Sequence, residues 1–338
     1  MASEGANGPE VPDERRQALQ RRRVDRKRQI RRRRIVAFGA LAAVIVAVIA
    51  VIALASGGRS SSRGSGSSHI ARQSSATTGK QGGEKGSGGQ GGGSEGGKVR
   101  NSTPQPDWEP HTGPVPILEY HVLGEPEGEV PYPELYVSRP DFRHQLEWLD
   151  ENGYQAVTLE QVEAAWYHGG TLPPKPVVLS FDDGYRPQFT FALPQLRKHG
   201  WAGVLNLKAE GSDLYESNVK AMIAAGWELA AHTIHHLDLT ELGPEQLEEE
   251  VAGSKAMLEG EFHVEVKNFC YPAGQFDETV IAAVEKAGYV GATTEIPGYA
   301  EKDAPYELAR FEILGSTGVE GLAQDLETGE GETGELGA

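Results

Sequence analysis

Seven short apolar or alternating runs, most of them separated by helical patterns, occupy the part of the chain between residues 113 and 317. The runs are 115–121, 177–183, 202–207, 227–233, 268–274, 290–295 and 307–314. Buried strands that alternate with helices are typical of a parallel sheet covered on both faces. The pattern therefore predicts one α/β domain over residues 113–317.

Two of the helical patterns, residues 139–151 and residues 244–259, define an apolar face. The face positions are Phe142, Leu146 and Leu149 in the first pattern and Leu247, Val251 and Met257 in the second. Closure of the seven strands into a barrel-like sheet and an open, doubly wound sheet both fit this order of elements. Both architectures place active sites at the carboxyl ends of the strands.

An apolar run of 21 uncharged residues, 35–55, is long enough to span a bilayer, at about 31 Å as a helix. Residues 1–34 before it hold 12 Lys and Arg against 5 Asp and Glu. The positive-inside rule therefore predicts a basic cytoplasmic segment, a single transmembrane signal-anchor in the cell membrane and an extracytoplasmic location for the α/β domain. A cleavable signal peptide that leaves Ser56 as the first residue is the alternative; it fits less well, because signal peptides have shorter basic and apolar regions.

The remaining segments are predicted to lack a core. Residues 56–112 begin as a Gly/Ser-rich linker, and residues 318–338 are rich in Glu and Gly, so both are expected to be solvated and disordered. The whole chain has a net charge of −17, although its first 34 residues carry +7, which leaves −24 on the rest. An acidic folded part disfavours nucleic acid as a partner. The single cysteine, Cys270, excludes an intramolecular disulfide.

Polar groups follow four of the predicted strands at their carboxyl ends. They are His121, the pair Asp182 and Asp183, His232, and the turn 271–274 with the sequence YPAG. Each has an ordinary interpretation as a turn or surface residue when taken alone. Because all four fall at the functional edge of such a sheet, the group indicates a site.

His232 and His236 are four residues apart, a spacing that brings two imidazoles to one side of a helical turn and lets both bind one metal ion. Asp183 supplies the carboxylate of a His-His-Asp set with open positions for water and substrate. Successive residues that leave a strand point in different directions, so Asp182 is free for another role. A non-haem iron oxygenase has the same ligand types, but an alternating α/β chain does not suit that class of protein.

The motifs Ser180–Gly184 (SFDDG) and His232–His236 (HTIHH) together resemble the polysaccharide deacetylase family, the enzymes with NodB homology. The resemblance runs from about residue 116 to residue 313, and the two motifs follow each other in the family's order. It implies a distorted (β/α)7 barrel in which Asp183, His232 and His236 bind a divalent ion, usually zinc. It further implies that Asp182 is the base that takes a proton from an attacking, metal-bound water, and that Ala273 gives a backbone N–H to the oxyanion.

Two positions depart from the family pattern. The family's third motif begins with an Arg that orients the base, but Cys270 stands there, and Arg310 at the end of the last predicted strand is the proposed substitute. A surface ion pair is the alternative for Arg310. The late Leu-x-His general acid is missing, because no histidine follows His263. The early Tyr-His of poly-N-acetylglucosamine deacetylases points to His121 as the acid, with a structural role as the alternative.

The function predicted from these features is removal of N-acetyl groups from N-acetylglucosamine-containing wall or extracellular polysaccharide, including peptidoglycan. Two alternatives stay open: a wall-binding protein with little or no catalysis, and an O-acetyl esterase that acts on a polysaccharide. The aromatic residues Trp166, Tyr185 and Trp201 are candidates for stacking on sugar rings, although a place in the core suits each of them better.

Overall fold

The computed structural model of the protein describes residues 97–329. The predicted anchor, residues 35–55, lies outside the described residues, as do the basic segment and most of the linker. Among residues 97–329, no helix combines the length and the apolar character that crossing a membrane requires.

The main sheet is entirely parallel, and its strands follow the order β11-β10-β9-β8-β7-β2-β12, with β5 paired to β7. The strands are β2 (Ile117–Tyr120), β5 (Gln155–Val157), β7 (Pro176–Asp182), β8 (Val204–Leu207), β9 (Glu228–Ala231), β10 (Asn268–Cys270), β11 (Gly291–Thr293) and β12 (Phe311–Glu312). All seven predicted strands are confirmed, and β5 is added to them. Because every strand points the same way, all the carboxyl ends meet at one edge of the sheet.

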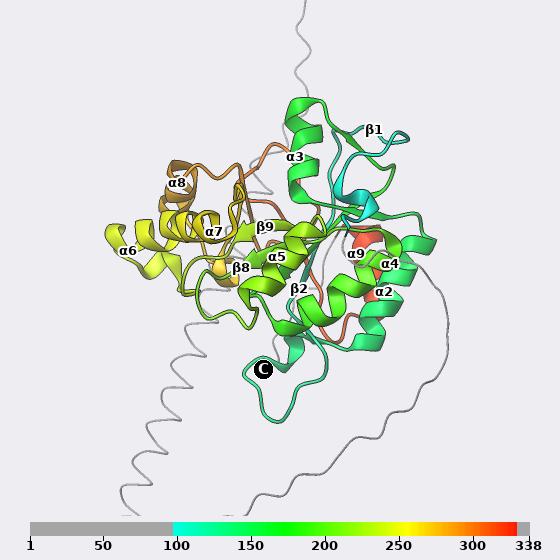
Figure 1. The fold of residues 1–338 in the computed structure, drawn as a ribbon, viewed down its shortest axis with the longest axis horizontal. Coiled ribbons are helices and arrows are strands. Elements are labelled where there is room, and N and C mark those ends of the chain that lie inside the picture. The colour runs from blue at the N-terminus through cyan, green and yellow to red at the C-terminus, as the bar shows by residue number, and fades with distance from the viewer. Residues whose placement is uncertain (1–96, 330–338) are drawn as a thin grey trace, which may run out of the picture. The chain divides into compact units, whose positions relative to one another are not determined.

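Helices cover the sheet, and two short strand pairs lie beside it. The helices are α2 (Arg139–Glu151), α3 (Leu159–His168), α4 (Leu193–His199), α5 (Glu216–Ala224), α6 (Pro244–Glu248), α7 (Ser254–Phe262), α8 (Glu278–Lys286) and α9 (Gly318–Thr328). The short pairs are β1 (Glu109–Pro110) with β6 (Thr171–Leu172), antiparallel, and β3 (Val122–Leu123) with β4 (Tyr136–Val137), parallel. In Figure 1, α2, α4 and α9 gather on one side of the domain and α6, α7 and α8 on the other.

The sheet curls into a half-barrel, and backbone hydrogen bonds between residues 292–296 and residues 305–310 join its two edges. Between β11 and β12 the ladder is replaced by a single parallel bridge, Thr293 to Leu308. The backbone N–H of Arg310 donates to the carbonyl of Ile296 in the same region. The observed architecture is therefore the curled parallel sheet of a distorted barrel.

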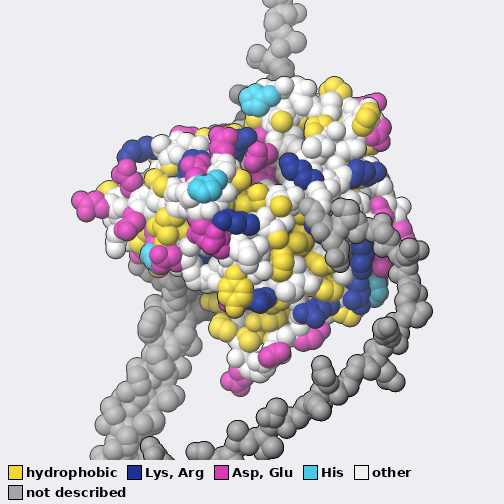
Figure 2. Space-filling model, viewed as in Figure 1, with side chains coloured by type: hydrophobic (Ala, Val, Ile, Leu, Met, Phe, Trp, Pro, Cys, Tyr) yellow, Lys and Arg dark blue, Asp and Glu magenta, His cyan; other side chains and the backbone are white. Residues whose placement is uncertain are grey.

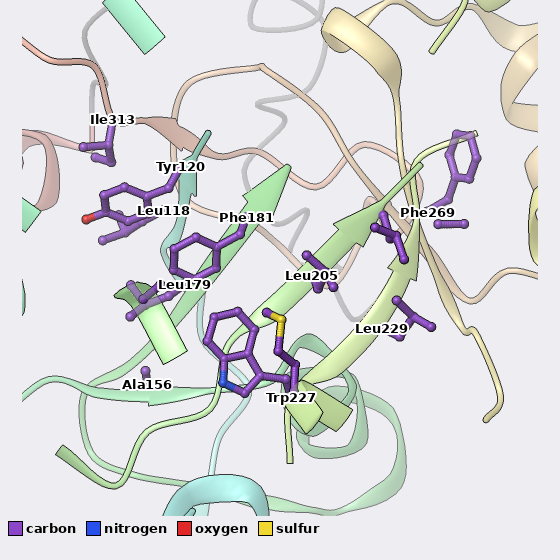
Figure 3. Packing of buried hydrophobic residues seen from close by; sticks show 14 of the residues in the cluster. Leu118, Tyr120, Ala156, Leu179, Phe181, Leu205, Trp227, Leu229, Phe269 and Ile313 are labelled. Carbon is purple, nitrogen blue, oxygen red and sulfur yellow. The ribbon is translucent and has the colours of Figure 1, made fainter. Parts of the chain in front are cut away.

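The outer face of the sheet packs against the helices through large aromatic and aliphatic side chains (Figure 3). Phe181 on β7 lies between Tyr120 on β2 and Trp227 before β9, with ring centroids 5.6 Å and 5.0 Å away. Phe142 of α2 meets Tyr120 edge to face at 5.1 Å. Burial of this much aromatic surface is the main force that holds α2 to the sheet.

The inner face of the sheet changes character along the strands. Its amino-terminal half is apolar, with Ile117, Val178, Val204 and Ala230 in a second buried cluster. Two residues further along the same strands, and thus on the same face, stand Glu119, Ser180, Asn206 and His232. The strand period of two therefore places a polar layer above an apolar plug, at the carboxyl edge.

The helix predicted over residues 139–151 is confirmed, and its three face positions are all buried. It begins where the Ser138 side chain accepts a hydrogen bond from the Asp141 N–H, a cap that satisfies one of the free donors of the first turn. Local sequence and burial agree here, which explains why the prediction succeeds.

The helix predicted over residues 244–259 is interrupted by a π-helical turn, Glu249–Gly253, between α6 and α7. Leu247 and Val251 are buried as predicted, but Met257 is 39% exposed and Leu258 is only 1% exposed. Leu258 stands seven residues after Val251, close to two full turns of an α-helix, whereas Met257 stands six residues after it, about 120° around the helix from that face. The prediction for Met257 was wrong for this reason.

Both predicted boundaries of the domain fall short of the folded region. Gly318–Thr328, expected as a solvated tail, forms α9, whose Leu322 and Leu326 are buried in the main core. The Gln145 side chain of α2 donates to the Gly318 carbonyl at 3.0 Å. At the other end, Val99 and Trp108, expected in the linker, are also buried. A few apolar residues in a polar segment are therefore enough to order it when neighbouring elements bury them.

Charge is unevenly spread over the face shown in Figure 2, where acidic side chains gather over α6 to α8 and Lys and Arg side chains lie over α2 and α4. Exposed glutamates of the acidic area are Glu245, Glu248, Glu249 and Glu261.

Buried acids occupy the amino-terminal end of the inner face, on the far side of the apolar plug from the polar layer. Asn268 donates to Glu163 at 3.1 Å and to Glu228 at 2.9 Å, and the Glu160 N–H donates to Glu228 at 2.9 Å. Burial raises the pKa of Glu163 to about 7, and burial followed by Glu160 and Glu163 raises the pKa of Glu228 to about 8. The folded protein therefore holds protons here that an unfolded chain would release.

These two acids predict a loss of stability towards alkaline pH. Their folded pKa values lie above the ordinary value near 4.5, so their contribution is complete below pH 4.5 and is lost as the pH rises through 7 to 8. One proton contributes a slope of at most about 1.4 kcal/mol per pH unit. The variant Glu228→Gln mimics the protonated acid, so we expect its free energy of unfolding, from urea titrations at pH 5.5 and 8.5, to fall less than that of the unsubstituted protein. Glu245→Gln, on the surface, is the control that keeps the original slope; an equal slope in Glu228→Gln would contradict the prediction.

Candidate active site

The predicted site residues converge at the carboxyl edge of four neighbouring strands. His121 follows β2, Asp182 ends β7, Asp183 comes next, and His232 follows β9. The strands lie in the order β9-β8-β7-β2, so β8 lies between the strand that carries His232 and the strand that carries the two aspartates. This arrangement confirms the expectation that polar strand ends gather at one edge.

Asp183, His232 and His236 form a group that fits a divalent ion. The Oδ1 atom of Asp183 lies 3.9 Å from Nε2 of His232 and 3.6 Å from Nε2 of His236. Ligand atoms around a tetrahedral zinc ion are about 3.3 Å apart, so small movements would close the set. Nδ1 of His232 lies 2.8 Å from the Cys270 carbonyl, which fixes the ring and leaves Nε2 for the ion.

Neutral imidazoles are the form that a metal ion requires. Burial, then His232, lowers the pKa of His236 to about 4, so this ring is neutral at physiological pH. Burial acts to raise the pKa of Asp183, but His232 and His236 outweigh it, and the net pKa is lowered. The group therefore offers the neutral imidazole of His236, the ionised carboxylate of Asp183 and the Nε2 atom of His232.

A loop, rather than a helical turn, brings the two histidines together. His232 to His236 adopt no helix; the chain reverses, and the Thr233 hydroxyl accepts a hydrogen bond from the His236 N–H at 2.9 Å. The Glu250 carboxylate accepts from the N–H groups of Ile234 and His235, each at 3.0 Å. The helical geometry predicted from the spacing was wrong, although the two rings do meet, with centroids 4.7 Å apart.

His235 turns away from the group formed by Asp183, His232 and His236. Its ring binds Glu250 at 2.6 Å and faces Glu210 at 3.5 Å. It therefore helps to hold the loop and is not part of the ligand set.

Backbone strain is concentrated at this edge. Among residues 97–329, five non-glycine residues have positive φ, and four belong to the site: Asp183, Thr233, His236 and Ala273. Such conformations cost about 1 kcal/mol or more for residues with a Cβ atom. The fold tolerates them because they aim the ligands and the turn at a common point.

Asp182 is held by three neighbours. The Asn206 amide donates to Oδ1 at 2.6 Å, the Arg310 guanidinium contacts Oδ2 at 2.9 Å, and the Cys270 thiol donates to Oδ2 at 3.3 Å. Burial acts to raise the pKa of Asp182, but Arg310, His232 and His121 outweigh it and hold the pKa well below its usual range. The group is thus an oriented, ionised carboxylate beside the metal ligands.

Arg310 occupies the place beside the base that the sequence suggested for it. It is 1% exposed, which excludes a surface ion pair. Its Nη1 binds Asp182, its Nη2 lies 3.0 Å from Glu119, and its Nε donates to the Thr294 carbonyl at 2.9 Å. The guanidinium therefore reaches Asp182 from the residue directly before β12, whereas Cys270, where the family pattern predicts the Arg, lies on β10.

His121 is buried on the other side of Asp182. Its Nε2 lies 3.7 Å from Glu119 Oε1, and its Nδ1 has no hydrogen-bond partner among the described residues. Burial lowers the pKa of His121, while Asp182 and Asp183 act in the opposite direction. The Gln188 amide donates to the backbone carbonyls of both His121 and Asp182 and ties the two strand ends together.

Ala273 lies in a one-turn 3₁₀ segment, Pro272–Gly274, directly after β10. Its φ of 48° and ψ of 31° are left-handed. The hydrogen bonds of the turn come from the N–H groups of Gly274 and Gln275, so the Ala273 N–H is not used in them.

Several functional neighbours were missed by sequence reasoning. They are Glu119, Asn206, Lys208, Gln188 and Glu250. Lys208 Nζ lies 3.3 Å from Asp183 Oδ1, at the end of β8. The strand period was the available signal, since Glu119 and Asn206 share the inward face with residues two positions away. Of the aromatic candidates, Trp166 and Trp201 are buried, and only Tyr185 stays partly accessible beside Asp183.

A second possible ligand set, Asp182, His232 and Cys270, lies equally close together. The Nδ1 atom of His232 is occupied by the Cys270 carbonyl, and Asp182 is engaged by Arg310. Burial raises the pKa of the Cys270 thiol well above its ordinary value, so the thiolate is disfavoured. The set with Asp183 is therefore the better metal site.

Comparison with known proteins gives consistent results. The family profile described as polysaccharide deacetylase matches residues 169–292. The provisionally named polysaccharide deacetylase YxkH of Bacillus subtilis is 34% identical over 215 residues, which cover 62% of this chain and 74% of that protein. Poly-beta-1,6-N-acetyl-D-glucosamine N-deacetylase of Escherichia coli is 39% identical over 95 residues, 28% of this chain and 14% of that enzyme.

Solved structures have the same fold. The polysaccharide deacetylase BC0361 from Bacillus cereus superposes with a TM-score of 0.56 at 28% identity, over 63% of this chain and 69% of that one. The Streptococcus pyogenes deacetylase PplD, in complex with acetate, gives a TM-score of 0.59 at 24% identity, over 63% and 98%. The curled parallel sheet and its matches define the class of protein: a deacetylase, and thus a hydrolase. The chain belongs to the polysaccharide deacetylase family.

The ligand group predicts how zinc binding responds to substitution. We expect Asp183→Asn to lower the affinity for zinc by at least about 100-fold, measured by isothermal titration calorimetry, because the only carboxylate of the set is lost. His235→Ala is the matched control, since this neighbouring histidine faces Glu250 instead. Equal affinities in Asp183→Asn and the unsubstituted protein would contradict the assignment.

The ion pair of Asp182 predicts the effect of substituting Arg310. We expect Arg310→Ala to lower kcat by about 100-fold with little change in KM, because the base loses its orientation. Loss of the guanidinium also raises the pKa of Asp182, so the acid limb of the pH–rate profile should move to higher pH. Arg310→Lys keeps the charge and serves as a second variant in case the first fails to fold. An acid limb that does not move in either variant would refute the role.

Proposed function

We propose that this protein removes N-acetyl groups from an N-acetylglucosamine-containing polysaccharide, in a reaction that depends on a divalent ion. The observation that carries the proposal is the convergence of Asp183, His232 and His236 beside the ionised carboxylate of Asp182. The choice of substrate is supported by the similarity to the poly-β-1,6-N-acetyl-D-glucosamine N-deacetylase.

The residues have distinct roles in this proposal. An ion bound by Asp183, His232 and His236, most simply zinc, would activate water and polarise the acetyl carbonyl. Asp182 accepts the proton of the attacking water, and Arg310 and Asn206 keep its carboxylate in place. The Ala273 N–H is oriented by the left-handed turn to donate to the developing oxyanion.

His121 is the proposed general acid. Departure of an amine from an amide needs a proton on nitrogen, whereas an activated ester releases its alcohol without one. His121 lies on the side of Asp182 that faces away from the histidine ligands' strand, and its Nδ1 is free of protein partners among the described residues. This placement supports a proton donor opposite the base.

Exposed tyrosines support a long glycan as substrate. Tyr132 and Tyr215 are 60% and 63% exposed, in loops that follow the carboxyl ends of β3 and β8. The Arg186 guanidinium lies over the Tyr215 ring at 4.5 Å and holds it at the rim. Aromatic faces of this kind stack on sugar rings. With residues 35–55 as an anchor, the domain would act on a polymer outside the cell membrane.

Product analysis tests the proposed function. We expect acetate release from N-acetylglucosamine oligomers by the full chain with added zinc, and no release after chelation. Asp182→Asn should lower kcat by about 1,000-fold and keep zinc binding. Release of acetate only from O-acetylated glycans would favour the esterase. Binding of glycan with no release of acetate from either substrate would favour the silent wall-binding protein.

A further inference from the structure

Glu119 is a buried acid at the centre of the site with no role assigned so far. It lies on β2, is 1% exposed, and faces the inside of the curled sheet opposite Ser180. A carboxyl group removed from water in this way destabilises the fold unless charged or polar neighbours compensate for it. Its neighbours therefore indicate why it is there.

The first neighbour is Arg310. Nη2 of Arg310 lies 3.0 Å from Glu119 Oε1, while Nη1 lies 2.9 Å from Asp182 Oδ2. One guanidinium is thus held between two carboxyl groups, one on β2 and one on β7. With the bond from Nε to the Thr294 carbonyl, all three guanidinium nitrogens are fixed.

The second neighbour is His121. Glu119 and His121 are two positions apart, and Nε2 of the ring lies 3.7 Å from the same oxygen, Oε1. This contact is too long for a hydrogen bond, and neither Glu119 oxygen makes a well-aligned one among the described residues. The Oε1 atom of Glu119 therefore faces two groups. One is the Arg310 guanidinium, which contacts Asp182, and the other is the ring of His121, the proposed acid.

We propose that Glu119 is a positioning residue that links the two halves of the reaction, by holding Arg310 against Asp182 and by orienting the His121 ring. This inference rests on the proposed function. A second carboxyl beside one guanidinium would be surplus if Arg310 needed only to be neutralised, since Asp182 already does that. The contact of Glu119 with His121 explains why a second carboxyl group is present.

The charge balance supports this role. Burial raises the pKa of Glu119 well above its usual range, Arg310 opposes this, and Asp182, Glu295 and Glu312 reinforce it. Burial lowers the pKa of the neighbouring His121. The two shifts run in opposite directions, which favours a single proton shared between the Glu119 carboxyl group and the His121 ring that it faces.

Two substitutions at residue 119 separate the two contacts. Glu119→Gln keeps an oxygen for Arg310 but no longer carries the proton or the charge that faces His121. We expect it to lower kcat for an N-acetylglucosamine oligomer by about tenfold to 100-fold, with KM within about threefold, and to leave hydrolysis of p-nitrophenyl acetate within about threefold. Glu119→Ala loses both contacts and should lower both rates.

The matched control is Glu163→Gln, which removes a buried acid at the opposite end of the inner face and should change neither rate. Zinc affinity should be the same in all variants, because Glu119 does not contact the ligands. The inference is overturned if Glu119→Gln lowers amide and ester hydrolysis equally, or if it leaves both unchanged.

A spectroscopic measurement keeps the test independent of activity. In the full chain, we expect separate, slowly averaging Nη–H resonances for Arg310 in the ¹H–¹⁵N NMR spectrum of the unsubstituted protein and of Glu119→Gln. In Glu119→Ala they should broaden and merge, because Nη2 loses its partner. Unsubstituted protein inactive on both substrates would sink the proposed function, whereas Arg310 resonances unchanged in Glu119→Ala would sink the role of Glu119.

Discussion

The site depends on one buried positive charge that the fold has to pair. Arg310 is removed from water on the segment that joins the two edges of the curled sheet. Its guanidinium is compensated by Asp182 on β7 and Glu119 on β2. An unpaired charge in this position would cost several kcal/mol. The sheet therefore closes in the register that brings Arg310 to Asp182, so the same contacts fix the architecture and the candidate site.

The inner face of the sheet turns this pairing into a defined site. An apolar plug formed around Val178 and Val204 separates the polar layer from the buried acids at the amino-terminal end. The plug keeps water away from the underside of the reaction centre, and low polarity there strengthens every charged contact above it. Four of the five strained non-glycine residues in the described part of the chain lie at the carboxyl rim, where the chain leaves the rigid strands. Stability is thus supplied by the strands, and function is placed at their ends.

The arginine beside Asp182 comes from a different part of the chain than the family pattern predicts. Cys270 on β10 donates its thiol to Asp182 but carries no charge, and Arg310, directly before β12, supplies the guanidinium. Both side chains reach the same carboxylate because the curled sheet brings β10 and β12 to opposite sides of one interior. The early histidine, His121, reaches the site by the same principle, from β2. In a parallel half-barrel, residues at the carboxyl ends of different strands can therefore contribute to the same site.

The sequence by itself determined the seven strands, the helix over residues 139–151 and the gathering of Asp182, Asp183, His232 and His236 at one edge, because hydrophobic period and strand-end polarity are local properties. The strand period places Glu119 and Asn206 on the inward face, but their contacts with Arg310 and Asp182 form only once neighbouring strands are in register. Sequence reasoning failed for residues 318–328, whose few apolar side chains gain stability only against the rest of the core. The helical turn predicted for the histidines was a loop, because Glu250, distant in sequence, holds its backbone. The tertiary structure alone decided these features, because each depends on a contact between segments that only folding brings together.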